Sequence, residues 1–396
     1  MFNFNYKYLS AKHLKGFENY KYSAIDTSPL SNYVMHPLWN FSVKIIPSWI
    51  APNLITFVGF LFLLTDVLVV TVLDYHNDVA GTDAGQKAMS LAGENGIPNW
   101  VYMMCGIFLF INYNLDGIDG KQARKIGVSG PIGELFDHGL DSYVVFFVPY
   151  SLISIFGRGE YSVPPIRIYV AIVSITLNYF VSHCEKYNTG TLYLPWGYDF
   201  SMWVSSLVFI VAGVYGPAVY KTYVLEGMTF MQALEIAIHV TGFLSTLPIS
   251  AYNVYLSYKH RTGKMYPLLE ALRPIYAMVL MVGAMTTWAL ISPNNIVDHQ
   301  LRPFLLLLGT MFSNISCRLI VAQMSSQRCD AINWMTWPLV AGIALSSYYP
   351  SVDVAILHLL LLGFLYAHIH YGVCVVRQMC GHFKVKCFSV PKTKKK

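Results

Sequence analysis

Long apolar runs constrain the fold of this chain more than any other feature. An α-helix rises 1.5 Å per residue, so about 20 apolar residues cross a bilayer core of roughly 30 Å. Only 12% of the residues are charged and 55% are hydrophobic, whereas a soluble domain carries roughly 25% charged residues. We therefore predict an all-α, polytopic membrane protein. About ten transmembrane helices are expected, near residues 52–73, 98–115, 138–157, 165–184, 200–220, 229–253, 271–292, 301–324, 332–349 and 353–373.

The apolar runs belong to one membrane domain with a short segment on each side. Residues 1–50 are expected to form a cytosolic lead-in. Aromatic residues and a lysine between Leu30 and Trp49 are typical of a helix that lies in the membrane interface. Residues 51–375 are predicted to form the transmembrane domain, and residues 376–396 a basic cytosolic tail.

Lysine and arginine are distributed unevenly between alternate connections. One set of connections, with both ends of the chain, holds most of the positive charge. The opposite set holds only Lys87, Arg158, Arg167, Lys221 and Arg302. Because positively charged connections stay in the cytosol, both termini and residues 116–137 are predicted to face it. We attribute the net charge of +6 to this topology and to anionic membrane lipid, not to a nucleic-acid partner.

Four aspartates interrupt the apolar pattern. Asp116 and Asp119 are spaced i, i+3, and Asp137 and Asp141 are spaced i, i+4, so on helices each pair shares one face. Acidic residues beside a membrane core are costly, and converging carboxylates repel one another unless cations lie between them. Magnesium takes oxygen ligands and commonly combines carboxylates with substrate phosphates. The spacing predicts a phosphate-handling metal site where the second span ends and the third begins.

Small and basic residues accompany these aspartates. Gly120 and Ala123 leave room for a ligand to approach the backbone. Lys121, Arg124 and Lys125 supply positive charge for phosphate oxygens. Small and basic residues beside acidic ones indicate a nucleotide diphosphate as the ligand.

The complete spacing carries a family resemblance. From Asp116 to Asp141 it reads D-x2-D-G-x2-A-R-x8-G-x3-D-x3-D. This pattern resembles the signature of the CDP-alcohol phosphotransferases, membrane enzymes that move a phospho-alcohol from a cytidine nucleotide to a lipid acceptor. The run from Pro52 to Thr56 resembles the start of that family's first helix. Stretches such as KYSAIDTSPLSNYVMHPLWN and EKYNTGTLYLPWGYD resemble the eukaryotic choline- and ethanolaminephosphotransferase group over nearly the whole chain.

The resemblance implies roles for particular residues. It implies two Mg²⁺ or Mn²⁺ ions that bridge the donor diphosphate, because two metals can stabilise both the attacking and the leaving oxygen. Their implied ligands are Asp116, Asp119, Asp137 and Asp141. Beside Asp116, the implied cytidine and phosphate site is lined by Asn53, Gly120, Ala123 and Arg124, with Lys121 and Gln122 as neighbours.

The resemblance also implies the reaction. Phosphoethanolamine would pass from CDP-ethanolamine to diacylglycerol, giving phosphatidylethanolamine and CMP, and a homodimer is expected. A choline-specific or dual-specificity enzyme is the alternative within the family, because tyrosines too numerous to define an aromatic cage leave the headgroup open. The alternative from another class is a transporter or lipid scramblase. Transport predicts broken helices near mid-membrane, whereas this charged cluster lies at one membrane face.

The acceptor hydroxyl needs a base, and two candidates remain open. Asp141 could take the proton, although metal binding would lower its basicity. His138 is spaced i, i+4 from Glu134, which could orient the imidazole. A histidine also titrates nearer neutral pH than a metal-bound aspartate. The sequence favours His138 oriented by Glu134, with Asp141 as the alternative.

Two further features have two interpretations each. His183, Glu185 and Lys186 lie at the cytosolic end of the fourth span, where they would either reach the site or anchor the helix in the interface. The run from Lys392 to Lys396 resembles a K-x-K-x-x retrieval signal of the endoplasmic reticulum or early Golgi. The alternative is a basic tail held by anionic lipid. Both interpretations of the tail place it on the cytosolic face.

Overall fold

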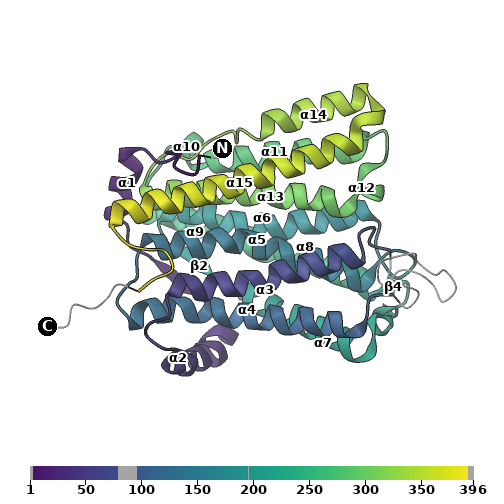
Figure 1. The fold of residues 1–396 in the computed structure, drawn as a ribbon, viewed down its shortest axis with the longest axis horizontal. Helices are drawn as coiled ribbons and strands as arrows, with labels where there is room; N and C mark the ends of the chain where they lie inside the picture. The colour runs from purple at the N-terminus through teal and green to yellow at the C-terminus, as the bar shows by residue number, and fades with distance from the viewer. Residues whose placement is uncertain (1–2, 79–95, 195, 391–396) are drawn as a thin grey trace.

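The fold is a bundle of long helices (Figure 1). The computed structural model describes residues 3–78, 96–194 and 196–390. Its helices are α1 (Ala11–Glu18), α2 (His36–Ile45), α3 (Pro52–Leu73), α4 (Asn99–Lys125), α5 (Pro131–Phe156), α6 (Pro165–Thr189), α7 (Gly197–Tyr215), α8 (Phe230–Thr241), α9 (Leu247–His260), α10 (Leu268–Ala271), α11 (Arg273–Ile291), α12 (Ile296–His299), α13 (Leu301–Ser325), α14 (Thr336–Tyr348) and α15 (Asp353–Phe383). Strand β1 (Ala24–Asp26) pairs in parallel with β2 (Leu192–Leu194), and β3 (Tyr223–Leu225) pairs antiparallel with β4 (Met228–Thr229).

Nine helical segments of the described chain are long and apolar enough to cross a bilayer, which confirms the predicted polytopic all-α fold. Helices α8 and α9, joined by a wider turn over Gly242–Thr246, make one of them. Several spans begin at a proline, as α3, α5 and α6 do. Proline suits this position because the first helical residue needs no N–H partner and proline's φ angle already matches a helix.

The tenth expected span, residues 332–349, differs from the prediction. Helix α14 covers only 13 residues of it, about 20 Å at 1.5 Å per residue, which is shorter than a bilayer core. The side chain of Asn333 accepts a hydrogen bond from the backbone N–H of Met335 and donates one to Asn314 on α13. These bonds hold the chain in a turn, so the helix starts at Thr336 and not at the start of the apolar run.

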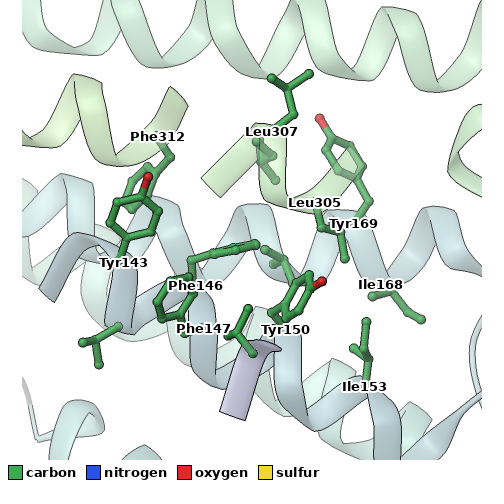
Figure 2. Close-up of a cluster of buried hydrophobic side chains, with 14 of the residues drawn as sticks. Tyr143, Phe146, Phe147, Tyr150, Ile153, Ile168, Tyr169, Leu305, Leu307 and Phe312 are labelled. Carbon is green, nitrogen blue, oxygen red and sulfur yellow. The ribbon is translucent and has the colours of Figure 1, made fainter. Parts of the chain in front are cut away.

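Helix α13 is the centre of the bundle. Within its most apolar stretch 83% of the residues are buried, compared with 22% for the α8–α9 span. Figure 2 shows the aromatic rings of Tyr143, Phe146 and Tyr150 on α5 in the cluster that α5 forms with α6 and α13. A Cβ atom on Gly309 of α13 would lie 2.5 Å from the Phe146 ring. Only glycine therefore allows α13 to pack this closely against α5.

Helix α2 lies along the outside of α4 (Figure 1). Its Trp39 is buried over Gly117, where a Cβ atom would lie 2.2 Å from the indole ring. On the other side of α2, Phe41 and Ile45 are 61% and 69% exposed. Helix α2 thus packs one face on the bundle and exposes an apolar face on the other side. This arrangement fits the predicted interfacial helix.

Both ends of the described chain lie at the same end of the bundle. Helix α1, the end of α15 and the connection between α4 and α5 are close together at the left of Figure 1. This is the arrangement that the predicted topology requires. Lys87 and the retrieval-like motif from Lys392 to Lys396 lie outside the described residues.

Candidate active site

The signature residues occupy the facing ends of two long helices. Helix α4 continues beyond its apolar run to Lys125, and α5 already begins at Pro131. Asp116 and Asp119 therefore lie on the last turns of α4, and Asp137 and Asp141 on the first turns of α5. The spacing of each pair places both carboxylates on one helix face.

The carboxylates of the two helices converge. Oxygen atoms of Asp116, Asp119 and Asp137 lie within 4.8 Å of one another, and so do ligand atoms of Asp137, His138 and Asp141. Asp137 belongs to both groups, and its Oδ1 is buried without a hydrogen-bond partner. Buried polar atoms are normally paired, so this oxygen is available to a ligand. Hard divalent cations take carboxylate oxygens, and this cluster of acids fits such a cation.

Two hydroxyl groups from other helices hold the carboxylates in place. Thr56 on α3 donates a hydrogen bond to Oδ2 of Asp119. Tyr198 on α7 donates one to Oδ2 of Asp116 at 3.1 Å. Sequence reasoning missed both hydroxyls, because no local spacing indicates which distant helices face α4. Hydrogen bonds of this kind fix the orientation of metal-binding carboxylates.

His138 is buried with one ring nitrogen facing an acid and the other facing no partner. Its Nδ1 lies 3.5 Å from Oδ2 of Asp141. Its Nε2 is buried and has no hydrogen-bond partner in the described structure. The Tyr179 hydroxyl donates to the backbone oxygen of His138 at 2.6 Å, and the His183 ring lies 5.6 Å away. The arrangement leaves Nε2 available to accept a proton.

Glu134 has partners other than the expected histidine. Its Oε1 accepts hydrogen bonds from Lys186 on α6 and from the Tyr20 hydroxyl at 2.5 Å, while its Oε2 is buried without a partner. The predicted pairing of Glu134 with His138 is therefore not the one that this structure forms. Burial and the neighbouring Glu134 carboxylate raise the pKa of Tyr20 well above its usual range, so its hydroxyl remains a donor.

The three residues at the end of α6 have different roles. His183 and Lys186 contact the site, as one of the two interpretations of the sequence expected. Glu185 points elsewhere: it accepts hydrogen bonds from Ser250 and Asn253 on α9, both at 2.7 Å. Glu185 thus joins two helices and takes no part in the site.

The residues expected to contact the nucleotide divide into two groups. Asn53, Gly120, Lys121, Ala123 and Arg124 line one cavity together with the four aspartates. Within it, Asn53 donates to the backbone oxygen of Cys387 at 3.0 Å, and Lys121 donates to Asn40 at 2.8 Å.

Gln122 does not belong to that cavity. It is fully buried, and its side-chain amide donates to the backbone oxygens of Pro47 and Ile50 at 3.0 and 3.2 Å. On a helix, neighbouring residues point in different directions, and Gln122 points toward the connection between α2 and α3. Gln122, expected as a neighbour of the nucleotide site, thus lies outside the cavity lining and anchors that connection.

The cavity has a volume of about 1260 Å³ and two chemically different parts. The acidic cluster and the basic residues of α4 lie at its polar end. Its other walls are apolar side chains of α5, α6 and α8, among them Val148, Leu152, Ile172, Ile175, Leu234 and Ile238. A charged ligand and a lipid chain can therefore occupy the same cavity.

Comparisons with known proteins agree with this geometry. A sequence model of the CDP-alcohol phosphatidyltransferase family matches residues 49–313. Proteins of Mus musculus and Homo sapiens, both named ethanolaminephosphotransferase 1, are each 42% identical to this chain over 98% of it and 96% of their own length. Choline/ethanolaminephosphotransferase 2 of Arabidopsis thaliana is 27% identical over 97% of this chain and 98% of its own length. The chain therefore belongs to the CDP-alcohol phosphatidyltransferase family.

Proposed function

We propose that this protein is a metal-dependent ethanolaminephosphotransferase. It transfers phosphoethanolamine from CDP-ethanolamine to diacylglycerol and releases phosphatidylethanolamine and CMP. The observation that carries the proposal is the cavity that joins four converging carboxylates to an apolar chamber between membrane helices. The names of the two mammalian relatives support ethanolamine as the headgroup.

The polar end of the cavity is proposed to bind the nucleotide. Two Mg²⁺ or Mn²⁺ ions held by the four aspartates would neutralise charge on the diphosphate and on the attacking and leaving oxygens. Arg124 and Lys121 contribute further positive charge. Gly120 and Ala123 leave space beside α4, and Asn53 lines the same cavity.

The apolar chamber is proposed to bind diacylglycerol. Its walls on α5, α6 and α8 match the acyl chains, whose burial in apolar surroundings is favourable. The hydroxyl group of the lipid would then lie next to His138, where the chamber meets the acidic cluster.

His138 is proposed as the general base. The acceptor oxygen forms a bond to the phosphorus that carries ethanolamine, the bond from that phosphorus to the CMP oxygen breaks, and the hydroxyl proton passes to Nε2 of His138. Asp141 faces Nδ1 and is the carboxylate placed to orient the ring. Glu134 forms no hydrogen bond with His138 in the described structure. It positions Lys186 and Tyr20 at the edge of the site by accepting their hydrogen bonds.

The His138→Ala variant tests this assignment. We expect turnover to fall by about 10²–10⁴-fold, the usual contribution of a general base, while Mn²⁺-dependent binding of CDP changes little. Equal losses of turnover and CDP binding would instead show that His138 binds the nucleotide.

A reconstituted assay tests the function itself. Purified protein in vesicles containing diacylglycerol should release CMP from CDP-ethanolamine only when Mg²⁺ or Mn²⁺ is present. CDP-choline is assayed in parallel, because a cholinephosphotransferase or dual-specificity enzyme is the alternative that the plant relative's name supports. No CMP release from either donor would overturn the proposed activity.

The cellular location of the protein is also part of the proposal. We place the protein in the endoplasmic reticulum or Golgi membrane, with the acidic cluster facing the cytosol, where a water-soluble nucleotide can reach it. The distribution of lysine and arginine supports this orientation. Protease protection of a tag after Trp49 in intact organelles would contradict it. Homodimerisation stays a prediction.

A further inference from the structure

Asp199 is a buried acid in the cavity wall that the proposed reaction does not use. It lies on the first turn of α7, is 5% exposed and lines the same cavity as the four aspartates. Its Oδ1 accepts a hydrogen bond from the Tyr113 hydroxyl at 2.5 Å. The structure gives it no ion pair with any described lysine, arginine or histidine, and no hydrogen bond to Oδ2 within the described residues.

A mostly buried carboxylate is stabilised by a cation bound beside it. Lys121 and His36 line the same cavity, but both bind other residues. Lys121 donates to Asn40, and Nε2 of His36 lies 3.4 Å from Asp26. Burial and the charge of Lys121 lower the pKa of His36 below its usual value, so its imidazole is mainly neutral at neutral pH. Neither side chain forms an ion pair with Asp199 in the described structure.

Two tyrosines fix Asp199 beside the acidic cluster. Tyr113 on α4 binds Asp199 on α7, and Tyr198 on α7 binds Asp116 on α4. The two tyrosine rings lie 6.1 Å apart. This crossed pair of hydrogen bonds links Asp199 to Asp116, one of the proposed metal ligands.

Aromatic rings border the same part of the cavity. Trp39 and Tyr198 both line it, and the Trp39 ring packs edge-on against Tyr113 at 5.5 Å. Aromatic faces attract cations, including alkylammonium groups. A carboxylate and aromatic rings together fit an organic ammonium group better than a metal ion, which prefers oxygen ligands alone.

We propose that Asp199 binds the ammonium group of the alcohol carried by the CDP donor. This inference rests on the proposed function, which places the phosphorus next to Asp116. One ester oxygen and two carbons separate that phosphorus from the ammonium nitrogen. A primary ammonium donates a charge-assisted hydrogen bond to Oδ2. A quaternary ammonium has no N–H and is held only by charge and by the aromatic rings. Asp199 thereby favours ethanolamine over choline.

The test compares three donors in the wild-type protein and the Asp199→Asn variant. The donors are CDP-ethanolamine, CDP-choline and CDP-propanol, which has no amine. We expect kcat/KM for CDP-ethanolamine, measured relative to CDP-propanol, to fall at least tenfold in the variant. The fall for CDP-choline should be smaller, and the inhibition constant of CMP should change less than twofold.

Tyr113→Phe is the matched control, because it removes the hydrogen bond to Asp199 and keeps the carboxylate. A structural role for Asp199 predicts that both variants lower turnover equally with all three donors, which would overturn the proposal. Asp199→Glu keeps the charge and should retain the preference for amine-bearing donors. Its loss of that preference would overturn the proposal even where Asp199→Asn fails to fold. A wild-type protein inactive with every donor would overturn the proposed function instead.

Discussion

Two buried polar clusters at opposite ends of α5 differ in how completely the protein pairs them. Near its C-terminal end, Arg302 of α13 is fully buried and donates to the backbone oxygen and the carboxylate of Asp74, to Tyr150 and to Ser154. Near its N-terminal end, Asp137 Oδ1 and His138 Nε2 are buried without partners. The first cluster joins three helices, whereas the second leaves polar atoms available for ligands.

The difference has a physical basis. A buried ion pair is tolerable when hydrogen bonds satisfy the remaining polar atoms, and the Arg302 cluster approaches this condition. Several acids crowded together do the opposite, since each raises the cost of charging the others. A fold that keeps these crowded acids is less stable than it could be, which is common at functional sites. Mutations in the two clusters should therefore have opposite effects on stability and activity.

The largest effect is expected for Asp119→Asn. It removes a proposed metal ligand, and activity should fall by about 10³-fold or more, equivalent to roughly 4 kcal/mol. The melting temperature without metal should stay the same or rise, because one acid of the crowded cluster becomes neutral. Mn²⁺ should raise the melting temperature of the wild-type protein and raise that of the variant much less. A variant that loses both activity and metal-free stability would assign Asp119 to the structural framework.

Arg302→Met should have the second largest effect, and mainly on stability. It removes the guanidinium that pairs with the buried Asp74 carboxylate, a loss typically worth about 3–5 kcal/mol. Turnover per folded molecule should change less than twofold, because Arg302 lies at the other end of α5. Adding Asp74→Asn should recover part of the lost stability. Normal stability with reduced turnover would mean that the two clusters are coupled.

The sequence predicted the positions of the acidic groups because helix geometry is local. Spacings of i, i+3 and i, i+4 determine which side chains share a face, and Asp116 with Asp119, and Asp137 with Asp141, do so. The same rule predicted a contact between Glu134 and His138 that the structure does not form. Instead, Lys186 and Tyr20, from distant parts of the chain, donate hydrogen bonds to the Glu134 carboxylate. Spacing shows which contacts are possible, and packing selects among them.

Contacts between distant segments could not be predicted for the same reason. Thr56 and Tyr198 reach the aspartates from α3 and α7, and hydropathy does not specify which faces of two spans meet. Hydropathy also locates apolar runs, but it does not determine where a helix begins within such a run. Residues 332–349 are apolar, yet the hydrogen bonds of Asn333 delay the helix.

Tyr20→Phe should have a smaller effect. It tests the ion pair of Glu134 and Lys186, which shares features of both clusters. Glu134 and Lys186 are paired, like Arg302 and Asp74, but they border the site. Removing the Tyr20 hydroxyl deletes one hydrogen bond to a charged group, worth about 1.5–3 kcal/mol. We expect a lower melting temperature and a decrease in turnover of less than tenfold. Tyr22→Phe, whose ring lies over Lys186 at 5.0 Å, is the control and should change both quantities less.

The smallest effect is expected at the ion pair between the exposed Arg328 and the partly buried Glu270. The hydrogen bond from Arg328 lowers the pKa of Glu270 below its usual value of 4.5. The pair therefore contributes stability above the pKa of the unfolded chain, and this contribution disappears as the pH falls through the lower pKa of the folded state. Arg328→Gln should lower the melting temperature slightly at pH 7, and the difference from wild type should narrow between pH 5 and pH 3. Arg377→Gln, at another exposed arginine, should show no such narrowing. A difference that stays constant with pH would mean that Arg328 acts through packing and not through the charge of Glu270.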